Sequence, residues 1–125
     1  MRGPKEPVER ILVVDDSADS ALILKKLLSL KGHTVRTVVD GPAALECLDE
    51  FRPHAIVLDL NLPGLSGHEV AEAVRRHPTF GSVLMIAVTG RDRDEDRARS
   101  QEAGIDHHLV KPVDISQLAR LLVSK

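Results

Sequence analysis

Four short apolar runs in this chain each end on a polar residue that can take part in chemistry, and this pattern constrains the fold most. The runs are 11–14, 55–58, 87–88 and 109–110, and they end on Asp15 with Asp16, on Asp59, on Thr89 and on Lys111. A short apolar run that ends in a turn is typical of a buried strand. If these strands are parallel and adjacent, their polar ends meet at one edge of one sheet. The sequence therefore predicts a single site there.

Strand-like and helix-like stretches alternate along the chain. We expect strands over residues 10–14, 34–39, 54–58, 83–88 and 106–109. We expect helices over residues 18–31, 42–51, 67–77, 92–103 and 115–123. Ser66 and Asp114 are suited to cap the third and fifth helices, with Glu69 completing a capping box after Ser66. Strict alternation predicts an α/β fold, a doubly wound five-stranded parallel sheet with helices on both faces.

A chain of 125 residues is long enough for one domain with a buried core. Residues 1–9 are polar with two prolines, so we expect a flexible leader there and a folded domain over residues 10–125. No apolar run approaches the roughly 20 residues that cross a bilayer, and no signal-peptide segment begins the chain. We therefore expect a cytoplasmic protein that does not enter a membrane.

The composition argues against nucleic-acid binding by this chain. Its net charge is −2, it has no basic stripe, and it lacks Trp and Tyr for base stacking. The single cysteine, Cys47, excludes an internal disulfide and is expected to be a half-buried structural thiol.

Six histidines are scattered along the chain. Four are expected on the surface, namely His33, His54, His68 and His77. His107 and His108 are adjacent in a strand and should point to opposite faces, which disfavours a shared metal.

The predicted site concentrates negative charge. Asp15, Asp16 and Asp59 would repel one another, and a hard cation with oxygen ligands resolves that conflict. Mg²⁺ suits such a site because it takes one or two carboxylates, keeps waters and accepts phosphate oxygens. Lys111 adds a positive charge and Thr89 a hydroxyl donor. A carboxylate nucleophile, a divalent metal, a lysine and a hydroxyl together indicate phosphoryl transfer.

These residues, in this order, resemble the receiver domain of two-component response regulators over about residues 10–123. The resemblance implies strand order 2-1-3-4-5 and Asp59 as the phosphoacceptor. It implies Mg²⁺ held by Asp15, Asp16, Asp59 and the Asn61 backbone carbonyl. It implies that Thr89 and Lys111 contact the phosphoryl group and that the Lys111–Pro112 peptide is cis. The donor would be a phosphohistidine on a histidine kinase or a histidine phosphotransfer protein, with a fused or separate output partner.

One position departs from the receiver pattern. Many receivers have Tyr or Phe three residues before the lysine, and that ring moves with phosphorylation, whereas this chain has His108. We therefore expect His108 to alter the switch in which Thr89 takes part. The stretch 106–113 resembles receivers fused to hybrid histidine kinases.

Two other functions remain open at this point. An Mg²⁺-dependent aspartyl phosphatase of the haloacid dehalogenase type would carry Asp-x-Asp after its first strand, whereas this chain has Asp15-Asp16 there. A protein-binding module that no longer takes phosphate would not require the whole residue set. We expect a switch that catalyses only its own phosphorylation and dephosphorylation, not an enzyme that turns over a substrate.

Helix 92–103 is unusual because Ala98 and Ala103 are its only apolar residues. Such a helix buries little apolar area, so we expect weak anchorage. It is either a solvated surface helix or a mobile switch element.

Overall fold

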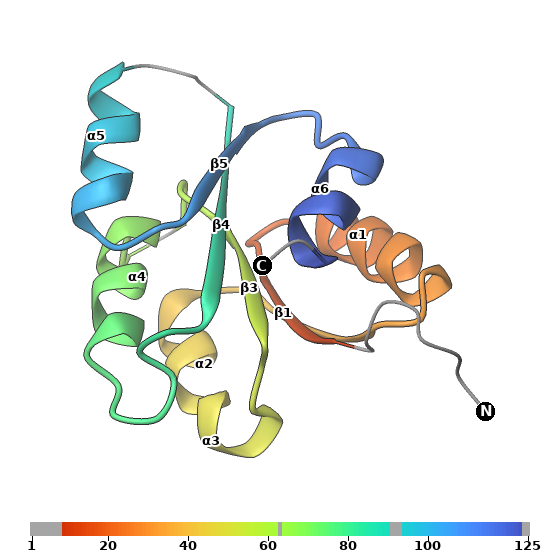
Figure 1. The fold of residues 1–125 in the computed structure, drawn as a ribbon, viewed down its shortest axis with the longest axis horizontal. Coiled ribbons are helices and arrows are strands. Elements are labelled where there is room, and N and C mark those ends of the chain that lie inside the picture. Colours follow the sequence, from red (N-terminus) through yellow and green to blue (C-terminus); the bar gives the residue numbers. More distant parts are fainter. Residues whose placement is uncertain (1–8, 63, 91–93, 124–125) are drawn as a thin grey trace.

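The structure is a computed structural model that describes residues 9–62, 64–90 and 94–123. Its strands form one parallel sheet (Figure 1). They are β1 (Arg10–Val14), β2 (Thr34–Val38), β3 (Ala55–Asp59), β4 (Leu84–Thr89) and β5 (His107–Val110). The sheet order is β2-β1-β3-β4-β5, which confirms the predicted fold class.

Helices cover both faces of the sheet. They are α1 (Ala18–Leu30), α2 (Gly41–Glu46), α3 (Leu48–Phe51), α4 (Gly67–Arg75), α5 (Asp94–Glu102) and α6 (Ile115–Val123). In Figure 1, α1 and α6 lie on one face, and α2, α3, α4 and α5 lie on the other. The first two residues of the expected helix 92–103 lie outside the described residues.

The strands supply the core by sending alternate side chains to the two faces. Leu12, Ile56 and Met85 are fully buried beneath the α2–α5 face. Ile11 and Ile86 are fully buried beneath α1 and α6. Both faces of β1, β3 and β4 are thus apolar, as expected for strands at the centre of a parallel sheet. This rigid sheet fixes the strand ends that carry the candidate site.

The local signals at the helix ends act as predicted. Ser66 and Glu69 form a capping box at the start of α4. The carboxylate of Asp114 accepts the backbone N–H groups of Ser116 and Gln117 at the start of α6.

One helix prediction was wrong in its continuity. The stretch 42–51 forms two short helices, α2 and α3, which are separated at Cys47. Cys47 has φ −90° and ψ −2°, and this tightened turn interrupts the regular helix. Its thiol is buried and contacts the carbonyl oxygen of Ala44, which agrees with a structural cysteine.

The expectation that four histidines lie on the surface was wrong for two of them. His33 and His68 are each 7% exposed. His33 Nδ1 accepts the backbone N–H of Glu9, and His68 bonds the hydroxyl of Ser100. Burial of an imidazole is favourable when such a polar partner is present, and the local sequence does not reveal a partner this distant. His54 and His77 are half-buried.

The expected leader lies mostly outside the described residues, which begin at Glu9. Glu9 itself is buried, and its carbonyl oxygen accepts the N–H of Thr34 at 2.9 Å. The division into a leader over residues 1–9 and a domain over residues 10–125 stays a prediction. Among the described residues, no helix has the length and apolar character needed to span a membrane.

Candidate functional site

The parallel sheet brings the carboxyl ends of four neighbouring strands together. Asp15 and Asp16 follow β1, Asp59 ends β3, Thr89 ends β4, and Lys111 follows β5. Asp59 is paired in register with Val88, the residue before Thr89. The backbone N–H of Lys111 donates to the carbonyl oxygen of Thr89 at 2.8 Å. These polar strand ends therefore lie at one edge of the sheet, as the sequence predicted.

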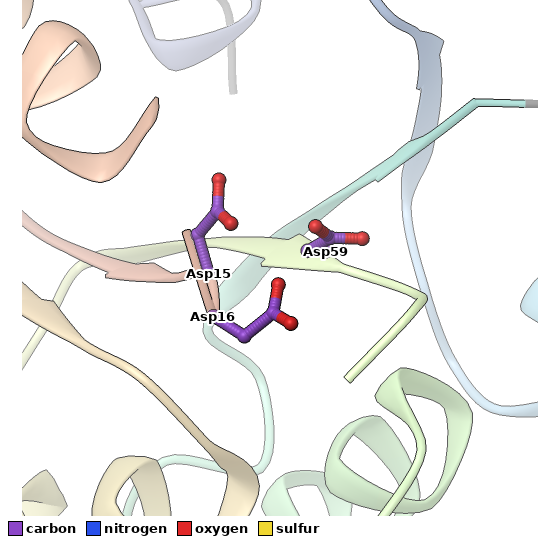
Figure 2. Close-up of side chains that lie close together, drawn as sticks. All are labelled: Asp15, Asp16 and Asp59. Atoms are coloured by element: carbon purple, nitrogen blue, oxygen red, sulfur yellow. The ribbon is translucent and has the colours of Figure 1, made fainter. Parts of the chain in front are cut away.

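The acidic cluster is formed by Asp15, Asp16 and Asp59, whose nearest carboxylate oxygens all lie within 4.8 Å of one another. Figure 2 shows the three carboxylates gathered at the ends of β1 and β3. Asp15 and Asp59 are buried, at 5% and 3% exposure, whereas Asp16 is exposed. Burial raises the pKa of Asp15 and the charges of Asp59 and Asp16 add to this, although the Ser17 N–H and Lys111 oppose it. The cluster is therefore short of positive charge.

Lys111 provides a positive charge next to Asp59. Its Nζ lies 2.9 Å from Asp59 Oδ2. This hydrogen bond is the main reason that the pKa of Lys111 is raised, and it keeps the ammonium charged. The Lys111–Pro112 peptide is cis, which confirms the prediction.

Two backbone N–H groups hold the buried carboxylates in place, and the sequence analysis missed both. The Asn61 N–H donates to Asp59 Oδ1 at 2.9 Å. The Ser17 N–H donates to Asp15 Oδ1 at 2.9 Å. Each is a turn in which an aspartate accepts the N–H two residues later, a local habit of Asp that could have been anticipated. Both oxygens of Asp59 are thus positioned by fixed donors.

The donor set fits a hard divalent cation. Three carboxylates with oxygens this close offer the ligands that Mg²⁺ prefers, and the exposed Asp16 leaves the cluster open to water. Asn61, whose carbonyl is the predicted fourth ligand, is exposed two residues after Asp59, the buried end of β3. The structure thus brings together carboxylates that could hold such a cation.

A groove of about 550 Å³ opens beside the cluster, between α1 and the segment that follows β5. Asp15, Asp59 and Lys111 line its polar part. Its apolar walls include Leu24 and Val113. A reacting group on another molecule could therefore approach Asp59 from this side.

His108, which occupies the aromatic position, is half-buried on β5. It lines a second groove of about 390 Å³ with residues of α5 and α6, among them Ser100 and Gln117. His107 is exposed.

Comparisons with known proteins agree with this geometry. Residues 11–123 match the family described as the response regulator receiver domain. The chain is 42% identical over 109 residues to the transcriptional regulatory protein PrrA of Mycobacterium tuberculosis, which covers 87% of the chain and 46% of PrrA. The chain thus spans about half the length of the curated relatives that it matches.

Solved structures give the same result. The chemotaxis protein CheY4 of Vibrio cholerae superposes with a TM-score of 0.88 at 28% identity, over 93% of this chain and 97% of CheY4. The receiver domain of a sensor histidine kinase from Pseudomonas aeruginosa superposes with a TM-score of 0.84 at 29% identity, over 93% of this chain and 95% of that domain. That structure has a magnesium ion coordinated in its active site cleft.

Proposed function

The chain belongs to the response regulator receiver domain family of two-component signalling, and on this basis we propose that Asp59 accepts a phosphoryl group. One observation carries the proposal. Asp59 is a buried carboxylate with Lys111 Nζ at 2.9 Å on one oxygen and the Asn61 N–H at 2.9 Å on the other. A buried, fully oriented carboxylate beside a groove is suited to act as a nucleophile in line with a leaving group.

The transfer step forms one bond and breaks one. A carboxylate oxygen of Asp59 attacks the phosphorus of a phosphohistidine, and the phosphorus–nitrogen bond breaks as the oxygen–phosphorus bond forms. The electron pair of the broken bond stays on the imidazole nitrogen of the donor. The product is an acyl phosphate on Asp59. Hydrolysis of this acyl phosphate by water restores the carboxylate and releases inorganic phosphate, so the chain catalyses only its own modification.

The charges around Asp59 support this step. Asp15, Asp16, Asp59 and the Asn61 carbonyl would hold Mg²⁺, which when bound offsets negative charge on the phosphoryl oxygens. Lys111 is already hydrogen-bonded to Asp59 and stays charged, so it can move to a phosphoryl oxygen without gaining a proton. Thr89, at the end of the neighbouring strand, would donate its hydroxyl to the phosphoryl group.

The partners follow from this chemistry. The donor is a phosphohistidine on a histidine kinase or a histidine phosphotransfer protein, and it would reach Asp59 through the groove beside α1. The output depends on a fused or separate partner, since the matched curated relatives are about twice as long as this chain. Two statements stay predictions: this chain alone binds no nucleic acid, and it acts in the cytoplasm.

The test is phosphorylation of the whole chain with Mg²⁺ and a small phosphodonor, followed by mapping of the modified residue. We expect one phosphoryl group on Asp59 and none in Asp59→Asn. The matched control is Asp19→Asn, which removes an exposed carboxylate on α1 and should leave the modification intact. Undiminished modification of Asp59→Asn would refute the assignment. Absence of modification in wild type would instead favour the phosphatase or the phosphate-independent binding module, which are tested by phosphate release and by partner capture.

A further inference from the structure

A buried polar contact joins α4 to α5 on the face opposite α1 and α6. His68 Nε2 and Ser100 Oγ share a hydrogen bond of 3.0 Å. Ser100 is 2% exposed and His68 is 7% exposed. Among residues 97–102 of α5, whose side chains the structure describes, Ser100 is the one that is buried. This contact is therefore a specific attachment of α5 to its neighbour.

The α4 end of this contact is pressed against the strand that carries Asp59. A methyl group at Gly67 would lie 2.7 Å from Leu60 Cα and 2.8 Å from the Asp59 carbonyl oxygen. The Gly67 N–H also points to the Leu60 carbonyl oxygen at 3.3 Å. No gap therefore separates the end of β3 from the first turn of α4, and His68 is the next residue along that turn.

The other end of α5 is held separately. Arg75, the last residue of α4, donates through Nε to the Gly104 carbonyl oxygen at 2.8 Å and through Nη2 to Asp106 Oδ2 at 2.9 Å. These bonds fix the turn between α5 and β5 but do not reach the Asp59 loop. The His68–Ser100 bond joins α5 to the end of α4 nearest Asp59.

We propose that His68 is a positioning residue that couples the state of the Asp59 site to α5 through its hydrogen bond to Ser100. This inference rests on the proposed function. A displacement of the β3 end on phosphorylation passes to the first turn of α4, because Gly67 leaves no space to absorb it. His68 moves with that turn, and Ser100 on α5 moves with His68, since breaking their buried hydrogen bond would be costly. Over residues 97–102, whose side chains the structure describes, α5 buries no apolar side chain that would resist this movement.

The test compares wild type with Ser100→Ala, which removes the hydroxyl and favours the helix, and with His68→Leu, which removes the imidazole. His68→Gln is the conservative variant, because its amide nitrogen can take the place of Nε2. Ser29→Ala, an exposed hydroxyl on α1, is the matched control. Amide chemical shifts and amide exchange are recorded for all five proteins, without and with Mg²⁺ and beryllofluoride.

In wild type we expect shifts at Asn61, next to the modified residue, and at the α5 amides of residues 97–102. In Ser100→Ala and His68→Leu, the Asn61 shift should persist and the α5 shifts should fall. Exchange of the α5 amides should also become about 2- to 10-fold faster without beryllofluoride, the effect of one lost hydrogen bond. His68→Gln should restore the α5 shifts, and Ser29→Ala should match wild type.

The inference is overturned if Ser100→Ala shows wild-type α5 shifts, or if His68→Gln behaves like His68→Leu. The proposed function has its own readout. Absence of any Asn61 shift in wild type would overturn the phosphoacceptor assignment and this coupling together. An Asn61 shift with unchanged α5 behaviour in the variants would overturn the coupling alone.

Discussion

At the scale of single residues, burying the carboxylates of the site costs stability, but it also holds Asp59 in a fixed orientation. Asp59 is stabilised on both oxygens, by an ammonium and by a backbone N–H, and charge-assisted bonds of this kind are stronger than neutral ones. Asp15 has one such donor, the Ser17 N–H, and faces two other carboxylates. Asp15 is therefore the member of the cluster that costs the folded protein stability until a cation binds.

Replacement of Asp15 by Asn should separate stability from metal binding. The amide oxygen can still accept the Ser17 N–H, while the buried charge is removed. We expect Asp15→Asn to be about 0.5–2 kcal/mol more stable than wild type without Mg²⁺ at neutral pH. Its Mg²⁺ affinity should fall at least about 10-fold, a loss seen even when an outer-shell group is removed. Denaturant unfolding and Mg²⁺ titration measure the two effects. Asp19→Asn is the control: it should leave the Mg²⁺ affinity unchanged and should not gain stability, because Asp19 lies in the first turn of α1, where a carboxylate is favourable.

The same variant predicts a pH dependence with a definite sign. The pKa of Asp15 is raised in the folded state, mainly by burial. Its contribution to stability is therefore complete below the pKa of the unfolded chain and is lost as the pH rises through the higher folded pKa. The stability advantage of Asp15→Asn should be largest at neutral pH and vanish in acid. An advantage that persists in acid would show that removal of charge is not its cause.

Gly67 is a second residue whose role is set by space. A Cβ there would lie under 3 Å from backbone atoms of both Asp59 and Leu60, so the strand end or α4 must move to admit it. We expect Gly67→Ala to lose about 1–3 kcal/mol, the usual cost of overpacking, despite the better helix propensity of alanine. Thermal unfolding measures the loss. Gly90→Ala is the matched control, since nothing lies within 4 Å of a Cβ at Gly90, and equal losses in both would contradict the steric account.

At the scale of elements, the sequence patterns were sufficient for most of the structure. Strand ends could be predicted because each apolar run stops at a polar residue, and helix starts because Ser66 and Asp114 cap them locally. The break between α2 and α3 at Cys47 could not be predicted, because the apolar periodicity of the sequence continues through Cys47 and only the backbone angles change. The burial of His68 could not be predicted either, since its hydrogen-bond partner Ser100 lies 32 residues away in the sequence.

Helix α5 should be the least protected helix of the domain. It contributes the buried Ser100, with Ala103 buried just beyond its end, whereas α1 buries Ala21 and the whole of Leu28. Full burial of one leucine stabilises by about 1.5–3 kcal/mol, so the amides of α5 should exchange at least about 10-fold faster than those of α1. Hydrogen exchange followed by residue measures this. Equal or slower exchange in residues 97–102 would mean that polar contacts such as His68–Ser100 hold α5 as firmly as a core does.

At the scale of the whole molecule, the candidate site lies at one edge of the sheet, and a change of its state can reach α5 and β5 on one side of the domain. Asp59 connects to α5 through α4 on one path, by way of Gly67, His68 and Ser100. A second path crosses the sheet from Thr89 to β5, where His108 faces the groove that Ser100 also lines. The paths differ physically, because the first depends on a hydrogen bond and the second on the volume of a side chain.

Substitution of His108 by Tyr tests the second path. If Thr89 turns toward a phosphoryl group as proposed, space should open beside β5, and an imidazole would fill it less completely than a phenol ring. We therefore expect wild type to show a modest beryllofluoride-dependent change across α5, β5 and α6, and His108→Tyr to enlarge it. The groove of about 390 Å³ beside His108 has room for the larger ring. The measurement is the amide chemical-shift change over the described residues from 97 to 120, and a large wild-type change that the variant does not increase would refute the idea. In the double variant with Ser100→Ala, the enlarged change should remain in β5 and α6 but shrink in α5, because volume still acts there while the hydrogen bond to α4 is gone.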